Sequence, residues 1–192
     1  AWTGGGTTTQ VAGEFAVWNT DTGKAEHVPL RSSKEGAWVG NAEYSRDGKR
    51  VVIVGRDHAY DVNKPFFCEV WDTTTRQLVG KLTGFEILRH ASFDSTGNRV
   101  AIASGKERAL IWDLDTGLRP VDLPHRQGVW WVKFSPDDNT LLTATQRSVH
   151  LWDPETGQQR IEPVATSGRS DPASGFNADG TRIVLSGSEG LL

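Results

Sequence analysis

One octapeptide pattern occurs four times in this chain, and this repetition limits the possible folds more than any other feature. The copies are "AVWNTDTG" (16–23), "EVWDTTTR" (69–76), "LIWDLDTG" (110–117) and "HLWDPETG" (150–157). Their Trp residues are separated by 53, 41 and 40 positions. Repeats of this period are typical of chains built from stacked supersecondary units, each of which buries its apolar face against the next.

A second motif recurs in step with the first. It reads "AEYSRDGKRVVIV" (42–54), "ASFDSTGNRVAIA" (91–103), "VKFSPDDNTLLTA" (132–144) and "SGFNADGTRIVLS" (174–186). In each copy, a short apolar run follows a turn rich in Gly, Asn and Asp, which supply the backbone angles that tight hairpins need. No segment sustains a helical period. Each repeat therefore predicts about four short antiparallel strands.

Together the two motifs resemble the WD-repeat β-propeller family, and residues 133–157 carry the resemblance most closely. The resemblance implies an all-β ring of four-stranded blades around a central channel, used as a platform for protein partners. It covers residues 1–192 as a single partial propeller of about four blades, in a family whose rings have seven or eight. The Trp strands are expected near 11–18, 66–71, 108–112 and 148–152. The chain also resembles bacterial-type WD-repeat arrays, which are often attached to regulatory domains.

Four blades make about half a ring, which leaves two ways to close it. The sequence contains no Met, which favours a fragment of a longer regulatory or signalling protein. Alternatively, two copies close a ring of about eight blades. An open stack of sheets exposes unpaired edges that can pair with another chain, so self-association stays open as well.

Composition argues against several classes of partner and location. Lys and Arg number 21 against 24 Asp and Glu, a net charge of −3 with no basic block, which disfavours nucleic acid. No apolar run is long enough to span a membrane. Cys68 is the only cysteine, so it forms no internal disulfide, and a cytoplasmic location is expected.

The repeated aromatic residues predict construction rather than chemistry. A large ring at the same register in each repeat is expected to lie on an inner strand and to pack between blades. The residues concerned are Trp18, Trp71, Trp112 and Trp152, with the second-motif anchors Tyr44, Phe93, Phe134 and Phe176. The family often braces each blade by hydrogen bonds from a His before the innermost strand and an Asp before the Trp strand. Only His125 stands in the His position, and no Asp stands six residues before any of the four Trp, so we expect this network to be absent or replaced throughout.

The repeats differ most at an insertion of about eight residues in "GRDHAYDVNKPFFCEVW" (55–71). The resemblance places this loop on the partner-binding face, where loops on a rigid scaffold carry function. Its candidate contact residues are His58, Tyr60, Asp61, Phe66 and Phe67. The alternative is a decorated hairpin whose two Phe side chains pack into the blade.

A second candidate contact region is "HRQGVWWVKF" (125–134). Strand alternation places Val132 on one side and Trp131 on the other, so one of Trp130 and Trp131 is expected near the channel mouth. The preceding repeat has Arg89 and His90 in the matching positions. Arg and Trp are enriched in protein–protein hot spots, although ordinary packing between blades accounts for at least one Trp equally well.

These patterns predict a non-catalytic protein-interaction scaffold that needs no cofactor and no metal. No catalytic residues are identified, because the five His show no metal-ligand spacing and no nucleophile has a recognisable base. The competing hypothesis is a propeller-type hydrolase or lactonase. Such an enzyme would need equivalent inward carboxylates or His in several blades, and the corresponding positions here hold dissimilar residues.

Overall fold

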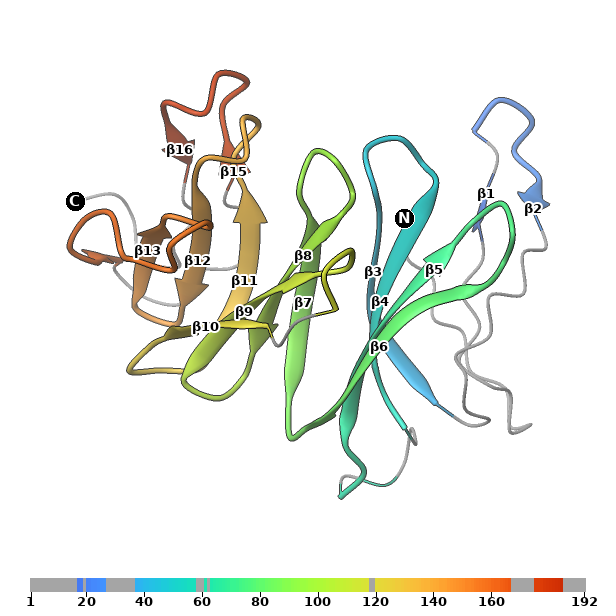
Figure 1. The fold of residues 1–192 in the computed structure, drawn as a ribbon, viewed down its shortest axis with the longest axis horizontal. Coiled ribbons are helices and arrows are strands. Elements are labelled where there is room, and N and C mark those ends of the chain that lie inside the picture. The colour runs from blue at the N-terminus through green and yellow to red at the C-terminus, as the bar shows by residue number, and fades with distance from the viewer. Residues whose placement is uncertain are drawn as a thin grey trace.

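The computed structural model describes residues 17–18, 20–26, 37–57, 61, 63–117, 120–166 and 175–184. All regular structure in these residues is β-strand, which confirms the all-β expectation. Three complete four-stranded antiparallel sheets lie side by side in chain order (Figure 1). Two-stranded hairpins precede the first sheet and follow the third. Each complete sheet corresponds to one blade of a propeller.

Each blade runs in sequence order from its first strand to its fourth. The first blade contains β3 (Trp38–Tyr44), β4 (Arg50–Arg56), β5 (Phe66–Asp72) and β6 (Leu78–Phe85). The second contains β7 (Leu88–Phe93), β8 (Arg99–Ser104), β9 (Arg108–Asp113) and β10 (Val121–Pro124). The third contains β11 (Val129–Phe134), β12 (Leu141–Thr145), β13 (Ser148–Trp152) and β14 (Val164–Ala165). The flanking hairpins are β1 (Val17–Trp18) with β2 (Ala25–Glu26), and β15 (Gly175–Phe176) with β16 (Ile183–Val184).

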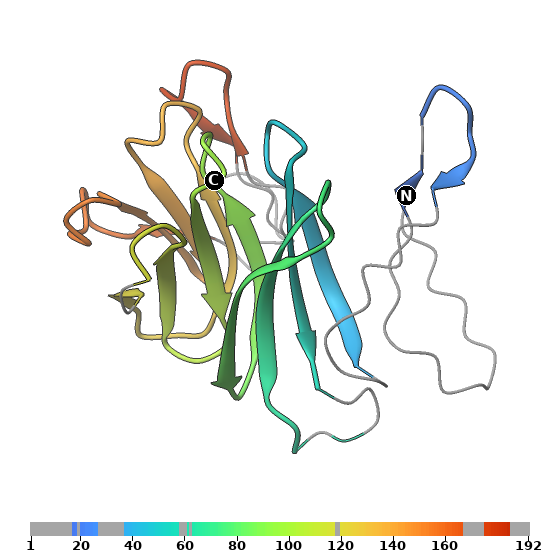
Figure 2. The same cartoon turned by 45° about the vertical axis from the view of Figure 1, so that its right-hand side comes forward.

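The first strands β3, β7 and β11 contact one another and form the inner edge of the stack. The hairpin turns β3–β4, β7–β8 and β11–β12 all lie at one end of the blades (Figures 1 and 2). We call that end the turn rim. The opposite end, where β3, β7 and β11 begin, we call the entry rim.

The Asp that follows each repeated Trp closes the turn into the fourth strand. Its carboxylate accepts two backbone N–H bonds in each blade: Asp113 Oδ1 accepts from Asp115 and Thr116, at 2.9 Å each. The same arrangement recurs at Asp72 and Asp153. These N–H donors lower the pKa of all three carboxyls. The Trp strand is therefore followed by an Asx turn in every complete blade.

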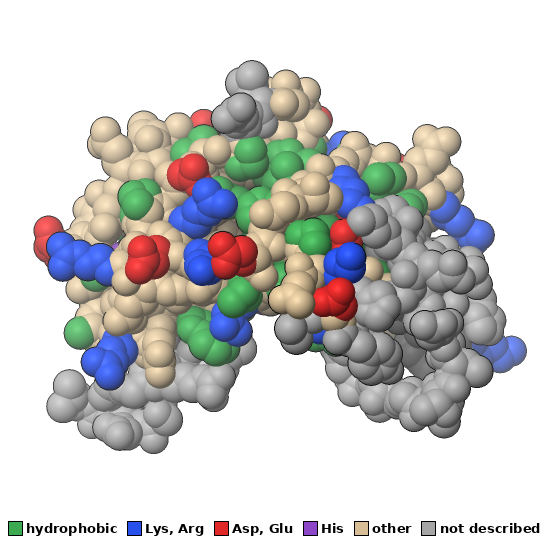
Figure 3. Space-filling view, turned by 90° about the horizontal axis from the view of Figure 1, so that it is seen from below, with side chains coloured by type: hydrophobic (Ala, Val, Ile, Leu, Met, Phe, Trp, Pro, Cys, Tyr) green, Lys and Arg blue, Asp and Glu red, His purple; other side chains and the backbone are tan. Residues whose placement is uncertain are grey.

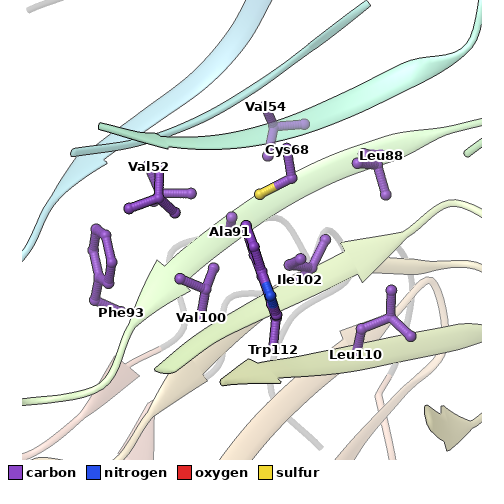
Figure 4. Close-up of a cluster of buried hydrophobic side chains, with 11 residues drawn as sticks. Val52, Val54, Cys68, Leu88, Ala91, Phe93, Val100, Ile102, Leu110 and Trp112 are labelled. Carbon is purple, nitrogen blue, oxygen red and sulfur yellow. The ribbon is translucent and has the colours of Figure 1, made fainter. Parts of the chain in front are cut away.

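The core consists of the apolar layers between neighbouring blades. In the layer between the first two blades, Trp112 packs with Val52, Val54, Cys68 and Ile102, among others (Figure 4). Trp152 occupies the equivalent place against the second blade. Both indoles are at most 6% exposed. Both residues lie on the third strand of a sheet (β9 and β13), and not on the first strand, which forms the inner edge of the stack.

The other repeated aromatics follow the same geometry where a preceding blade is present. Phe93 and Phe134 are each 5% exposed against the blade before them, and Phe176 packs partly buried against the third blade. Tyr44 is 44% exposed, so the packing role expected for it is not seen. Trp71 is half-buried, and the side chain of Trp18 lies outside the described residues.

Candidate partner-binding rim

The innermost strand of each complete blade carries a register shift close to the entry rim. The shifts fall between Val39 and Asn41 in β3, between Leu88 and His90 in β7, and between Val129 and Trp131 in β11. A β-bulge leaves one residue unpaired and redirects its side chain. The skipped residues are Gly40, Arg89 and Trp130, which are equivalent positions of the three blades.

The bulges of the second and third blades bring Arg89 and Trp130 together. The Arg89 guanidinium carbon lies 3.5 Å from the centroid of the Trp130 ring. Such cation–π contacts between Arg and Trp contribute about 0.5–2 kcal/mol, depending on desolvation. The contact joins two blades at the rim end of the inner edge, where the sequence predicted one Trp of the 130/131 pair.

Trp131 and His90 point away from this stack into the contact between blades. Trp131 is 8% exposed and packs with Leu142, Ala144 and Val149. The two rings of His90 and Trp131 lie 5.6 Å apart. Burial lowers the pKa of His90 to about 4, because desolvation disfavours the imidazolium. Trp131 is therefore a packing residue and not the partner contact proposed for it.

The first blade presents aromatic and Arg side chains at the same rim. Trp38 is 45% exposed and meets the edge of Phe66 at a centroid distance of 6.4 Å. The Arg56 guanidinium lies 5.8 Å from the Phe66 ring. Cross-strand pairing joins Trp38 to Arg56 and Arg56 to Phe66. Figure 3 looks onto this rim and shows charged side chains of both signs around patches of hydrophobic ones.

The insertion in the first blade lengthens strands as well as adding a loop. β4 extends to Arg56, and β5 starts at Phe66, with Asp57 N donating to Pro65 O across the opening at 3.1 Å. Phe67 is fully buried in the core of the blade, so it is wrong as a partner contact. The strand alternation that buries Phe67 leaves Phe66 on the other face, half-buried.

The remaining insertion residues are placed only in part. Asp61 is half-buried and accepts a backbone hydrogen bond from Asn63 at 3.0 Å, which makes it a turn residue. His58 and Tyr60 lie outside the described residues.

A polar chain crosses the three innermost strands. Glu43 Oε1 accepts hydrogen bonds from Ser92 Oγ at 2.9 Å and from Lys133 Nζ at 3.0 Å. The three residues occupy equivalent positions in successive blades, directly before the aromatic anchors. The Glu43 carboxylate and the Lys133 ammonium therefore neutralise each other's charge, and the Ser92 hydroxyl donates to the same carboxylate oxygen.

A network of hydrogen bonds holds the Trp152 indole in the third blade. Trp152 Nε1 donates to Thr143 Oγ1 at 2.9 Å, and Thr143 Oγ1 lies 2.7 Å from His125 Nε2. His125 Nδ1 lies 2.8 Å from the Leu123 carbonyl, which can only accept, so Nδ1 carries the proton and Nε2 accepts from Thr143. The network expected to be absent or replaced is present here in a replaced form, with a backbone carbonyl in place of the Asp.

The other two blades hold their Trp by different means. In the first, Trp71 Nε1 donates to Glu69 Oε2 at 3.1 Å, and Lys81 Nζ pairs with the other oxygen at 2.7 Å. Glu69 is completely buried, so this ion pair compensates its desolvation. In the second blade, Ile102 stands at the position of Thr143, and Leu110 stands at the position of Glu69, two residues before the Trp. Apolar packing therefore surrounds Trp112.

The third blade matches a known protein family, and longer stretches of the chain resemble known proteins. The family model "WD domain, G-beta repeat" matches residues 120–153, the stretch that contains His125, Thr143 and Trp152. This chain therefore contains a WD repeat. The WD-repeat chain is 33% identical over 129 residues to TBC1 domain family member 31 of Oryzias latipes, covering 64% of the chain and 12% of that protein. It is 28% identical over 138 residues to guanine nucleotide-binding protein subunit beta-1 of Drosophila melanogaster, covering 68% and 37%.

Among solved structures, a chain in the crystal structure of the mitotic checkpoint complex superposes with a TM-score of 0.73. The identity is 15%, and the alignment covers 90% of the WD-repeat chain and 52% of that chain. This likeness confirms the propeller fold. The WD-repeat chain thus spans about an eighth to a half of the lengths of the proteins it matches.

Three further observations concern metal binding, membrane spans and the one cysteine. Among the described residues, no group of three or more His, Cys, Asp and Glu side chains is placed to hold a metal ion. Within the same residues, no helix is long and apolar enough to cross a membrane. Burial raises the pKa of the Cys68 thiol far above its ordinary value, which keeps the group a packed, unreactive side chain.

Sequence reasoning missed Trp38 and Arg56, which the structure places at the entry rim. A signal was available in the register. Counting outward from the turn "RDGK" pairs Trp38 with Arg56 across the β3–β4 hairpin, once the one-residue bulge at Gly40 is allowed for. The bulge has no marker in the sequence apart from this Gly, and without it the pairing shifts by one residue.

Buried neutral His residues make the stability of the WD-repeat chain dependent on pH. Burial lowers the pKa of His125 from 6.5 to about 4, and neighbouring His150 adds to the shift. In the unfolded chain, His125 therefore binds a proton below about pH 6.5, whereas in the folded chain it does so only below about pH 4. The free energy of unfolding therefore decreases as the pH is lowered through this window. We expect His125 alone to contribute a loss of about 1–2 kcal/mol between pH 7.5 and 5. Denaturant unfolding at the two pH values measures it, and a His125→Gln variant with an unchanged pH slope would contradict it.

Proposed function

We propose that this chain is a non-catalytic protein-interaction scaffold, part of a larger regulatory or signalling protein, and that it binds its partner through the entry rim. The observation that carries the proposal is the Arg89–Trp130 stack at 3.5 Å, on the same rim as the exposed Trp38. Trp and Arg dominate protein–protein hot spots because each buries a large area while keeping a polar group available.

The construction of the rim supports a binding role. The blades are held by buried apolar layers and paired polar groups, so the rim side chains rest on a rigid base. Bulges are over-represented where a strand must redirect a side chain, and in two successive blades they direct Arg89 and Trp130 toward each other. Guanine nucleotide-binding protein subunit beta-1 and TBC1 domain family member 31 share the repeat with this chain, and regulatory proteins are the class that we infer for it.

The experiment is partner capture from the source cells with photo-crosslinking. The full chain carries a photoreactive amino acid at position 64, and the crosslinked proteins are quantified by mass spectrometry. We expect Arg89→Gln and Trp38→Ala each to lower recovery of the specific partner about thirtyfold, the loss that corresponds to a hot spot of about 2 kcal/mol.

The matched controls are Arg46→Gln and Leu78→Ala, which remove an exposed Arg at the turn rim and a 40% exposed Leu from an outer strand. Thermal unfolding shows whether each variant folds. Equal recovery with all four variants would overturn the entry rim as the binding face. Turnover of a substrate by the purified chain would overturn the non-catalytic role.

A further inference from the structure

A pocket of about 730 Å³ opens on the entry rim, beside the loop that links the second blade to the third. Its lining comes from the β10–β11 connection, from the turn between β12 and β13, and from the segment that follows β13. This volume lies within the range of ligand-binding sites in proteins. The pocket is separate from the Arg89–Trp130 stack, none of whose residues line it.

The pocket rests on an ordered polar base. His125 and His150 are 8% and 9% exposed, with ring centroids 4.6 Å apart. His150 Nε2 lies 2.9 Å from Ser148 Oγ, which in turn lies 2.9 Å from Thr145 Oγ1. Burial lowers the pKa of both imidazoles. Near neutral pH, this part of the pocket therefore supplies uncharged hydrogen-bonding groups.

The charge of the pocket comes from two guanidinium groups above this base. Arg126 and Arg147 are both exposed and both line the pocket, together with one acidic residue, Glu162. No ion pair joins either Arg to a described carboxylate. Elsewhere on this rim, by contrast, Lys106 pairs with Glu86 at 2.8 Å and Arg108 with Asp122 at 3.4 Å.

The positions of the two Arg residues are set by the backbone. Arg147 lies in the two-residue turn between β12 and β13, where its N–H donates to Thr145 Oγ1 at 3.3 Å and its carbonyl accepts from Thr166 N at 2.9 Å. Arg126 follows His125, whose N–H donates to the Glu107 carbonyl at 2.8 Å. Both side chains therefore project from anchored positions, which lowers the entropy lost when they bind.

We propose that this pocket docks an acidic segment of a protein partner, with its carboxylates paired to Arg126 and Arg147. The inference rests on the proposed function and names a chemistry for the partner. Arg is well suited to this task because its planar fork pairs with a carboxylate through two parallel hydrogen bonds. Ser148 and Gln127 supply neutral donors beside the two charges.

The size of the pocket favours a peptide segment over a single small anion. A water molecule takes about 30 Å³ of liquid, so the pocket has room for roughly two dozen waters, and an isolated phosphate would leave most of that space to solvent. A segment with two carboxylates offers one partner to each guanidinium group and occupies more of the volume than a single anion does. Charge complementarity of this kind also steers the partner toward the rim before contact.

The test is fluorescence polarisation of the full chain with three labelled peptides of one length. The first has Asp at alternate positions, the second has Asn in place of each Asp, and the third is the second peptide with phosphoserine in place of one Asn. We expect the Asp peptide to bind at least tenfold more tightly than the Asn peptide, with an affinity that falls as salt is added. The double variant Arg126→Gln/Arg147→Gln should lose this preference.

The matched control is Arg46→Gln/Arg182→Gln, which removes the same charge from exposed residues of the turn rim and should keep the preference. Equal binding of the Asp and Asn peptides would overturn the proposal, as would equal losses in the two double variants. Tight binding of the phosphoserine peptide or of inorganic phosphate, with weak binding of the Asp peptide, would overturn it in favour of a phosphate site. These outcomes leave the crosslinking test at Arg89 and Trp38 unaffected, so the two proposals fail separately.

Discussion

Replacing Trp112 with Ala should lower the free energy of unfolding by about 3–5 kcal/mol, the range for a large aromatic removed from a packed core. Its indole is 6% exposed and lies between the first two blades, among Val52, Val54, Cys68 and Val70. The cavity would open in a layer made of rigid strands, which collapse poorly around it. Denaturant unfolding followed by tryptophan fluorescence measures the loss.

Trp38→Ala is the matched control, because it removes the same side chain from a position that is 45% exposed. We expect that variant to lose no more than about 1 kcal/mol. Similar losses in the two variants would show that the layer between the blades does not hold the fold together. The contrast is informative because only one of these Trp residues belongs to the repeated octapeptide.

The second large effect is expected from Thr143→Val, which changes shape very little. The hydroxyl of Thr143 accepts from Trp152 Nε1 at 2.9 Å and lies 2.7 Å from His125 Nε2. Removing it leaves one buried donor and one buried acceptor without partners, at about 1–3 kcal/mol each. We expect a total loss of about 2–4 kcal/mol and a third blade that unfolds first, which hydrogen exchange of β12 and β13 can follow.

Thr143→Ser keeps the hydroxyl and loses one methyl group, so it should retain most of the stability. Equal destabilisation of the Ser and Val variants would show that the methyl group of Thr143 contributes as much as its hydrogen bonds, and a Val variant as stable as the parent chain would contradict the prediction. The equivalent position in the second blade is Ile102, fully buried, so a polar residue there would be without this network. Each of the three blades therefore holds its own Trp in a different way: by Glu69 in the first, by apolar packing in the second and by Thr143 in the third.

Much of the fold could be predicted from the sequence, because spacing alone carries it. Turn residues and apolar runs recur with one period, and the structure has a four-stranded sheet for each complete period. The residues of the candidate site were harder to predict. Residue type favours Phe67 and Trp131 as contacts, yet both are buried. A strand presents alternate residues to opposite faces, and a bulge decides which face each residue takes. The manner in which the ring closes, whether in a longer chain or by pairing of two copies, stays a prediction.

The sequence by itself determined the period, the turn chemistry and the resemblance to WD repeats, since these depend on residues close together in the chain. Only the tertiary structure decided which Arg and aromatic side chains meet. The Arg89–Trp130 stack, the Glu43–Lys133 pair and the hydrogen bonds of Thr143 join residues from different strands or blades. Whether such groups come within hydrogen-bonding distance depends on bulges and on the angle between sheets. A short stretch of sequence does not contain that information, because it arises from packing among segments far apart in the chain.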